Sequence, residues 1–111
     1  MNKLLIITLF LITSVGFSQT VKVNGIIKDS IGNPLELANV IAFVKGTSKV
    51  ESYSITNDKG EFRLVLPTNN TYSFRVSYIG FITQTDELFI ADDSDNITKN
   101  FNLIEEESFL K

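Results

Sequence analysis

The side chains that most often carry catalysis and metal binding are largely missing from this sequence of 111 residues, which contains neither histidine nor cysteine. The zinc site of a peptidase is built from His with a carboxylate, or from Cys, and keeps one position open for water. The sequence therefore excludes zinc peptidase chemistry. A serine nucleophile needs a base beside it, and no Lys or carboxylate stands at a spacing that nominates one. We predict a protein that is not an enzyme and needs no cofactor.

One loop gathers oxygen-bearing side chains that a cation could use. Four of them fall within one short segment: Asp92, Asp93, Asp95 and Asn96. Calcium takes about six to eight oxygen ligands, and the helix-loop-helix calcium motif also needs a glycine at its sixth position and a terminal glutamate, which this loop lacks. A solvated turn is the better interpretation.

Asn57 and Asp58 resemble a ligand pair, but Gly60 follows them closely. A glycine that can adopt a positive φ in this position is typical of a short hairpin loop. We therefore interpret Asn57-Asp58-Lys59-Gly60 as a turn between two strands. We predict no catalytic, cofactor-binding or metal-binding residue in the chain.

A sugar-binding surface would need exposed flat aromatic side chains beside polar groups. The chain has no tryptophan. Five aromatic residues fall on the apolar parity of their expected strands and are predicted to lie in a core: Phe62, Tyr72, Phe74, Tyr78 and Phe101. Tyr53, Phe81 and Phe89 remain as candidate surface contacts, so glycan recognition is kept as an alternative function.

The first 18 residues have the order of a secretory signal peptide. Asn2 and Lys3 form a short positive front, residues 4–12 are almost entirely apolar, and small and polar residues follow up to Ser18. The apolar run is shorter than the ~20 residues that a membrane-spanning helix needs. We predict cleavage before Gln19, no transmembrane segment after cleavage, and an exported protein that is periplasmic or associated with the outer membrane.

The charge balance argues against nucleic acid as a partner. The chain carries 10 basic and 13 acidic side chains, a formal net charge of −3, whereas nucleic-acid binding requires a basic face. The part that remains after cleavage is long enough to bury one core without disulfides, since about 60 residues suffice for many domains. We expect a single domain.

Apolar and polar residues alternate in short runs separated by turn residues, and no segment shows a helical stripe. This pattern is typical of two packed antiparallel sheets of about seven short strands. The expected strands are residues 21–28, 38–45, 51–56, 61–66, 72–78, 82–90 and 97–104. The second is apolar on both parities, which predicts a central or doubly covered strand. Gly80 predicts a bend before the sixth.

Four blocks of turn and strand residues stand out in this order. They are Val23-x-Gly25, then Asp29-x-x-Gly32-x-Pro34-Leu35-x-x-Ala38-Asn39-Val40, then Thr56-Asn57-Asp58-x-Gly60-x-Phe62, and finally Val76-Ser77-Tyr78-Ile79-Gly80-Phe81. Together they resemble the carboxypeptidase-regulatory-like domain family. The resemblance covers about residues 21 to 104, and four ordered blocks are far more specific than any one of them.

The resemblance implies an all-β, seven-stranded antiparallel β-sandwich of the transthyretin or prealbumin type, also called a carbohydrate-binding-like fold, over residues 19–104. Residues 105–111 would be an acidic tail or the start of a missing segment. In Bacteroidetes-type bacteria such a domain commonly follows the signal peptide of TonB-dependent outer-membrane receptors, ahead of the plug and barrel. The chain stops before either, so it looks like a fragment of such a receptor or a free-standing version of its periplasmic domain.

We expect a non-catalytic exported interaction and spacer module, whose working surface is a sandwich face or an unpaired edge strand. An exposed edge can accept another strand through main-chain hydrogen bonds. The expected partner is a protein, either an outer-membrane receptor or a periplasmic component. The alternative is a glycan-binding β-sandwich.

Overall fold

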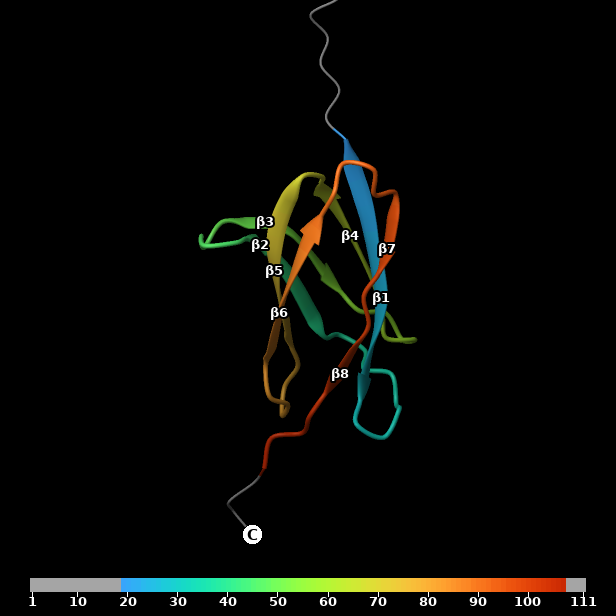
Figure 1. The fold of residues 1–111 in the computed structure, drawn as a ribbon. Helices are drawn as coiled ribbons and strands as arrows, with labels where there is room; N and C mark the ends of the chain where they lie inside the picture. The colour runs from blue at the N-terminus through green and yellow to red at the C-terminus, as the bar shows by residue number, and fades with distance from the viewer. Residues whose placement is uncertain (1–18, 108–111) are drawn as a thin grey trace, which may run out of the picture.

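The computed structural model describes residues 19–107, whose regular structure consists of β-strands in two packed sheets (Figure 1). The strands in this range are β1 (Thr20–Asp29), β2 (Asn39–Val44), β3 (Val50–Ile55), β4 (Glu61–Pro67), β5 (Asn70–Ser77), β6 (Gln84–Ile90), β7 (Asn96–Thr98) and β8 (Phe101–Leu103). Residues 19–107 contain no helix long and apolar enough to span a membrane. The predicted signal peptide, residues 1–18, and residues 108–111 lie outside the described residues.

The predicted β-sandwich is confirmed, with the strand orders β3-β2-β5-β6 in one sheet and β4-β1-β7 in the other, where β8 also pairs with β1. The predicted strand at residues 97–104 is divided into β7 and β8, so the described chain has eight strands where seven were expected. Both lie along β1 in the same register, since Val23 is opposite Ile97 and Ile27 is opposite Phe101. They therefore act as one interrupted strand.

The prediction of purely antiparallel sheets is wrong at this strand, because β7 and β8 both run parallel to β1. After β6 the chain crosses from one sheet to the other through residues 91–95, and it enters the second sheet beside the start of β1 (Figure 1). The N–H of Lys22 donates to the carbonyl of Asp95 at 3.2 Å. Entering at that end, the chain can only continue in the direction of β1.

The interruption between β7 and β8 is bridged by hydrogen bonds to β1. The N–H of Lys99 donates to the carbonyl of Asn24 at 2.8 Å, and the side-chain oxygen of Asn100 accepts the N–H of Ile26 at 3.0 Å. An amide side chain therefore replaces the main-chain acceptor at the break. The approach is close: a Cβ placed on Gly25 would lie 1.8 Å from the carbonyl oxygen of Lys99, so this position has room only for glycine.

The core lies between the sheets and is formed by alternate residues of the long strands. The buried apolar side chains are Val21, Val23, Ile27, Leu35, Ala38, Val40, Ala42, Phe62, Leu64, Leu66, Tyr72, Phe74, Val76, Ile90, Phe101 and Leu103. Four of the five aromatic residues predicted for the core are among them. The fifth, Tyr78, is half-buried and packs against Phe81, with ring centroids 5.5 Å apart.

The strand predicted at residues 38–45 does lie centrally, since β2 pairs with both β3 and β5. Its apolar residues on the outer face, Ile41 and Phe43, are half-buried. The guanidinium carbon of Arg75 on β5 lies 4.6 Å from the ring centroid of Phe43, a cation–π contact that partly covers the ring. The predicted bend at Gly80 is also confirmed, because this residue has φ 85° in the turn that follows β5.

Replacing Gly25 with alanine tests the close approach of the β7–β8 junction to β1. The new methyl group would overlap the Lys99 carbonyl, which is main chain and can move only with its neighbours, so we expect a loss of about 3 kcal/mol or more in the free energy of unfolding. Urea denaturation followed by circular dichroism measures it. Gly32→Ala is the control, because Gly32 has φ 94° and open space around it, and should cost only about 1 to 2 kcal/mol. Equal costs for the two variants would contradict the described packing.

Candidate functional site

The residues of the third sequence block build a turn and its anchor. The hydroxyl of Thr56, the one buried polar side chain among the described residues, donates to the carbonyl of Leu35 at 2.5 Å and accepts the N–H of Ala38 at 2.8 Å. It thereby satisfies two main-chain groups of the irregular segment that leads into β2. The presence of Thr56 in the sequence block is therefore explained by its structural role, since its hydroxyl is already engaged in these two hydrogen bonds.

The predicted turn at Asn57 to Gly60 is confirmed, but the predicted hairpin is wrong, because β3 and β4 lie in different sheets and β4 pairs with β1. The side-chain oxygen of Asn57 accepts the N–H groups of Lys59 and Glu61 at 3.0 and 2.9 Å, and its amide donates to the Glu61 carboxylate at 3.0 Å. Gly60 has φ 74°, and its carbonyl accepts the N–H of Ile27 at 2.8 Å. Asp58 is exposed at the tip.

The second sequence block forms another self-contained turn. One carboxylate oxygen of Asp29 accepts the N–H groups of Ile31 and Asn33 at 3.0 and 2.8 Å, and the other accepts the side-chain amide of Asn33 at 3.2 Å. The hydrogen bond from the Asn33 N–H is the largest of the effects that lower the pKa of Asp29 below its ordinary value. The carboxylate is used to hold the turn that returns the chain to Leu35.

The acidic loop forms a turn in which the N–H of Ser94 donates to the carbonyl of Ala91 at 3.1 Å. The side chains of Asp92, Asp93 and Asp95 are all exposed. Within residues 19–107, no three Asp or Glu side chains come together in a way that could hold a metal ion.

The three aromatic residues proposed as surface contacts do not come together. Tyr53 lies on β3 at one edge of its sheet, with 70% of its surface exposed, and Phe89 lies on β6 at the opposite edge, 58% exposed. Phe81 is half-buried against Tyr78. The structure therefore contains no shared aromatic platform of these three residues.

Two shallow depressions mark the outer face of the β4-β1-β7 sheet. One, of about 460 Å³, is lined by Asn24, Asn57, Glu61, Phe62 and Arg63. The other, of about 210 Å³, is lined by Ile26, Lys28, Asn100 and Asn102. Several of their polar groups already have partners, as the Asn57–Glu61 bond and the Asn100 bond to β1 show. Both are weakly equipped to bind a ligand.

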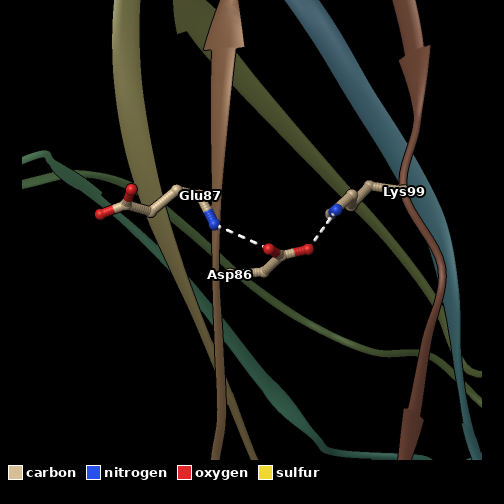
Figure 2. A network of polar contacts seen from close by, with 3 residues as sticks. All are labelled: Asp86, Glu87 and Lys99. Carbon is tan, nitrogen blue, oxygen red and sulfur yellow. Dashed lines mark hydrogen bonds and ion pairs between the residues drawn. The ribbon is translucent and has the colours of Figure 1, made fainter.

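The edge of β6 is blocked by polar side chains (Figure 2). The carboxylate of Asp86 accepts the N–H of Glu87 at 2.9 Å and pairs with the ammonium group of Lys99, which reaches across from the β7–β8 junction. The side chain of Gln84 donates to the carbonyl of Asn102. An edge N–H that is already bonded within the chain is not available to another strand.

Asp86 has its pKa lowered by these contacts, above all by the hydrogen bond from Lys99 and then by the bond from the N–H of Glu87. Both interactions favour the charged carboxylate. The side chain of Lys99 is 24% exposed and that of Asp86 51%. The pair therefore lies at the rim between the two sheets, where it links β6 to the opposite sheet.

The opposite edge of the same sheet is β3, whose pairing with β2 shifts register between Ala42 and Phe43, and the described residues place no ion pair across it like that of Asp86 and Lys99. β3 contacts β4 of the neighbouring sheet, and the N–H of Arg63 on β4 donates to the hydroxyl of Ser54 at 3.4 Å. Three apolar residues on β3 are exposed: Val50, Tyr53 and Ile55. Edge strands in soluble proteins are usually protected by charges, proline or a covering segment. The β3 edge is therefore the candidate binding site.

Sequence reasoning expected an edge strand to bind a partner but did not identify which one. Of the β3 residues, only Tyr53 was singled out, and the exposure of Val50 and Ile55 was missed. The Asp86–Lys99 pair was missed as well, because the two residues come from different sheets. The polar composition of residues 84–87 was the one available signal that this edge is protected.

The chain belongs to the carboxypeptidase regulatory-like domain family, which it matches over residues 22–104. The family is a non-catalytic, regulatory type of β-sandwich. This agrees with the local role of the motif residues, which hold turns and pack the core. A comparison with curated proteins finds no match.

Solved structures of other proteins share the fold. The Bacillus anthracis TIE protein aligns with a TM-score of 0.65 at 17% identity, over 78% of this chain and 17% of its own. Chlorocatechol 1,2-dioxygenase from Pseudomonas putida aligns with a TM-score of 0.64 at 11% identity, over 83% of this chain and 63% of its own. Catechol 1,2-dioxygenase from Acinetobacter sp. ADP1 also aligns with a TM-score of 0.64 at 11% identity, over 85% of this chain and 55% of its own. The chain spans less than two thirds of each protein, and at these identities the likeness concerns the fold alone.

Replacing Thr56 with valine removes the hydroxyl while keeping the shape of the side chain. The N–H of Ala38 and the carbonyl of Leu35 lose their partner inside the protein, so we expect the free energy of unfolding to fall by about 2 to 4 kcal/mol. Thr56→Ser keeps the hydroxyl and should retain most of the stability. Urea denaturation of both variants measures the difference, and a valine variant as stable as the serine variant would contradict the anchoring role.

The lowered pKa of Asp86 makes its contribution to stability depend on pH. The folded pKa lies below the ordinary value of 3.8, so the contribution is complete above that value and is lost as the pH falls through the folded pKa. Because the pair is partly exposed, we expect Asp86→Asn to cost at most about 1 kcal/mol at pH 7, with the difference vanishing in acid. Glu87→Gln is the control, since Glu87 and Lys45 are more than half exposed and 3.4 Å apart. A difference that is constant down to pH 2 would contradict the role assigned to Asp86.

Proposed function

We propose that this chain is an exported, non-catalytic interaction module that binds a protein partner by accepting an extended strand at the edge of β3. The observation that carries the proposal is the contrast between the two edges of one sheet. β6 is covered by Asp86, Gln84 and Lys99, whereas β3 offers an open edge flanked by exposed apolar side chains. Main-chain hydrogen bonds at such an edge supply affinity, and alternate side chains supply selectivity.

Export and the outer-membrane setting are parts of the same proposal. The first 18 residues have the composition of a cleavable leader. Membership of the regulatory-like family supports a role beside other domains or proteins. A periplasmic module of a TonB-dependent receptor, or a free-standing relative of one, fits these features. In that setting the sandwich would space and position its partner.

Glycan binding is the alternative function. The observation in its favour is the strongly exposed ring of Tyr53, together with the polar depression beside Arg63. Neither depression contains an exposed aromatic side chain against which a sugar ring would stack. Calorimetric titration with glycans, repeated with Tyr53→Ala and Phe81→Ala, separates this alternative from strand capture.

The partner-binding proposal is tested with the full chain, including its leader, produced in a bacterium with an outer membrane and carrying a C-terminal affinity tag. We expect the chain in the envelope fraction and a defined partner cross-linked to it in intact cells. Tyr53→Lys should reduce the cross-linked partner by about tenfold or more, because a charge in the middle of an edge strand opposes strand pairing.

Phe89→Lys is the matched control, since it places the same charge at the blocked edge of the same sheet. It should leave the cross-linked partner unchanged. An equal effect of the two lysine variants, or no effect of either, would contradict a binding edge at β3. Recovery of the chain from the cytoplasm with its leader intact would contradict the export.

A further inference from the structure

The hydrogen-bonding parity of β3 shows which of its main-chain groups are free to pair. The N–H of Thr56, directly after β3, donates to the carbonyl of Ala38 at 3.0 Å. In an antiparallel pair, successive residues alternate between facing the partner strand and facing away. Tyr53 and Ile55 therefore direct their N–H and C=O groups away from β2, whereas Glu51 stands at the register shift and has no paired residue on β2.

The side chains of the same residues lie on the outer face of the sheet. Tyr53 is opposite Ile41 of β2, which has its side chain on that face. Tyr53 and Ile55 are 70% and 52% exposed. A strand added at this edge would thus gain main-chain hydrogen bonds and cover apolar surface on one face.

The centre of β3 is a short symmetric sequence, Ser52-Tyr53-Ser54. Ser52 and Ser54 flank Tyr53 and are both half-buried on the inner side, Ile55 follows on the outer side, and Glu51 stands at the register shift between β2 and β3. When two copies of β3 lie antiparallel with their centres at Tyr53, Glu51 of each copy is opposite Ile55 of the other. In this register Ser52 of each copy is opposite Ser54 of the other, and their hydroxyl groups can form hydrogen bonds across the strands.

Charge favours this arrangement as well. Glu51 is the one charged residue within β3, and in the centred register it does not meet its own copy. Lys49, just before the strand, falls opposite Asn57 of the other copy. The centred register therefore places no like charges opposite each other, although the chain as a whole is acidic.

We propose that the strand accepted by β3 is β3 of a second copy of this chain, antiparallel and centred on Tyr53. This inference rests on the proposed function in one respect, namely that the β3 edge accepts a strand. The central pair, Tyr53 with Tyr53, exchanges main-chain hydrogen bonds, and Ile55 of each copy lies opposite Glu51 of the other. The two four-stranded sheets join into one continuous sheet, with β6 at both ends.

The dimer is weak and depends on concentration. Pairing through one short strand buries less than the roughly 1,200 Å² typical of stable complexes. The two protected β6 strands end the joined sheet, so further copies have no second open edge of this sheet to extend it. The assembly therefore closes at two copies, as expected of a two-fold interface.

Sedimentation equilibrium of the processed chain over a range of concentrations tests the inference. We expect the average mass to rise from that of one chain toward that of two. Tyr53→Pro removes the central pair of N–H donors without removing a β2–β3 hydrogen bond, and should weaken dimerisation by about tenfold or more. Thr85→Pro is the matched control on the blocked β6 edge and should leave dimerisation unchanged. Where Tyr53→Pro fails to melt cooperatively, Tyr53→Lys provides the same comparison.

A disulfide gives a second measurement, because the chain has no cysteine of its own. In the centred register the two Tyr53 Cα atoms lie about 5.5 Å apart, as in any hydrogen-bonded antiparallel pair, which is within the range a disulfide spans. Tyr53→Cys should form a covalent dimer on mild oxidation, and Thr85→Cys should not.

The outcomes separate this inference from the proposed function. A chain that stays monomeric at every concentration, while Tyr53→Lys still loses its cross-linked partner, overturns the self-pairing and leaves the strand-accepting edge in place. A dimer that persists unchanged in Tyr53→Pro or Tyr53→Lys places the interface elsewhere and also overturns it. If the chain stays monomeric and Tyr53→Lys leaves its cross-linked partner unchanged, both the self-pairing and the strand-accepting edge at β3 are overturned.

Discussion

The close approach of the Lys99 carbonyl to Gly25 is the contact on which the closure of this sandwich depends. β1 is the strand that both β4 and the interrupted β7–β8 strand must reach, and a side chain at Gly25 would hold the latter away. With the glycine in place, Lys99 and Asn100 bond to main-chain groups of β1. The buried residues Phe101 and Leu103 are then carried into the core on the same segment.

The same segment decides which edges of the molecule are open. Because the β7–β8 junction lies beside β6, Lys99 can pair with Asp86 and block that edge (Figure 2). No strand of the described chain pairs with the outer edge of β3, although β3 contacts β4 and Ser54 accepts a hydrogen bond from Arg63. The sandwich is thus closed at one side and open at the other. The open edge is the candidate binding site, while the motif residues hold the turns.

Much of the fold could be predicted because its signals are local. Alternation along single strands predicted two packed sheets and four of the buried aromatic residues, and the spacing from Asn57 to Gly60 predicted the turn, although the strands that it joins lie in different sheets and form no hairpin. The parallel pairing of β7 and β8 with β1 could not be predicted from alternation, since it depends on where the chain re-enters the second sheet. The two faces of a strand are encoded in its own residues, but its neighbours are not.

The candidate site shows the same division. By itself, the sequence determined that no histidine or cysteine chemistry is available, that the chain forms strands with one apolar face, and that its turns rest on residues such as Asp29 and Gly60. Only the tertiary structure decided that Phe81 packs inward against Tyr78 while Tyr53 faces solvent at an unpaired edge. The physical reason is that exposure and edge position depend on contacts between residues far apart in the chain, whereas turn geometry and strand alternation depend on residues next to one another.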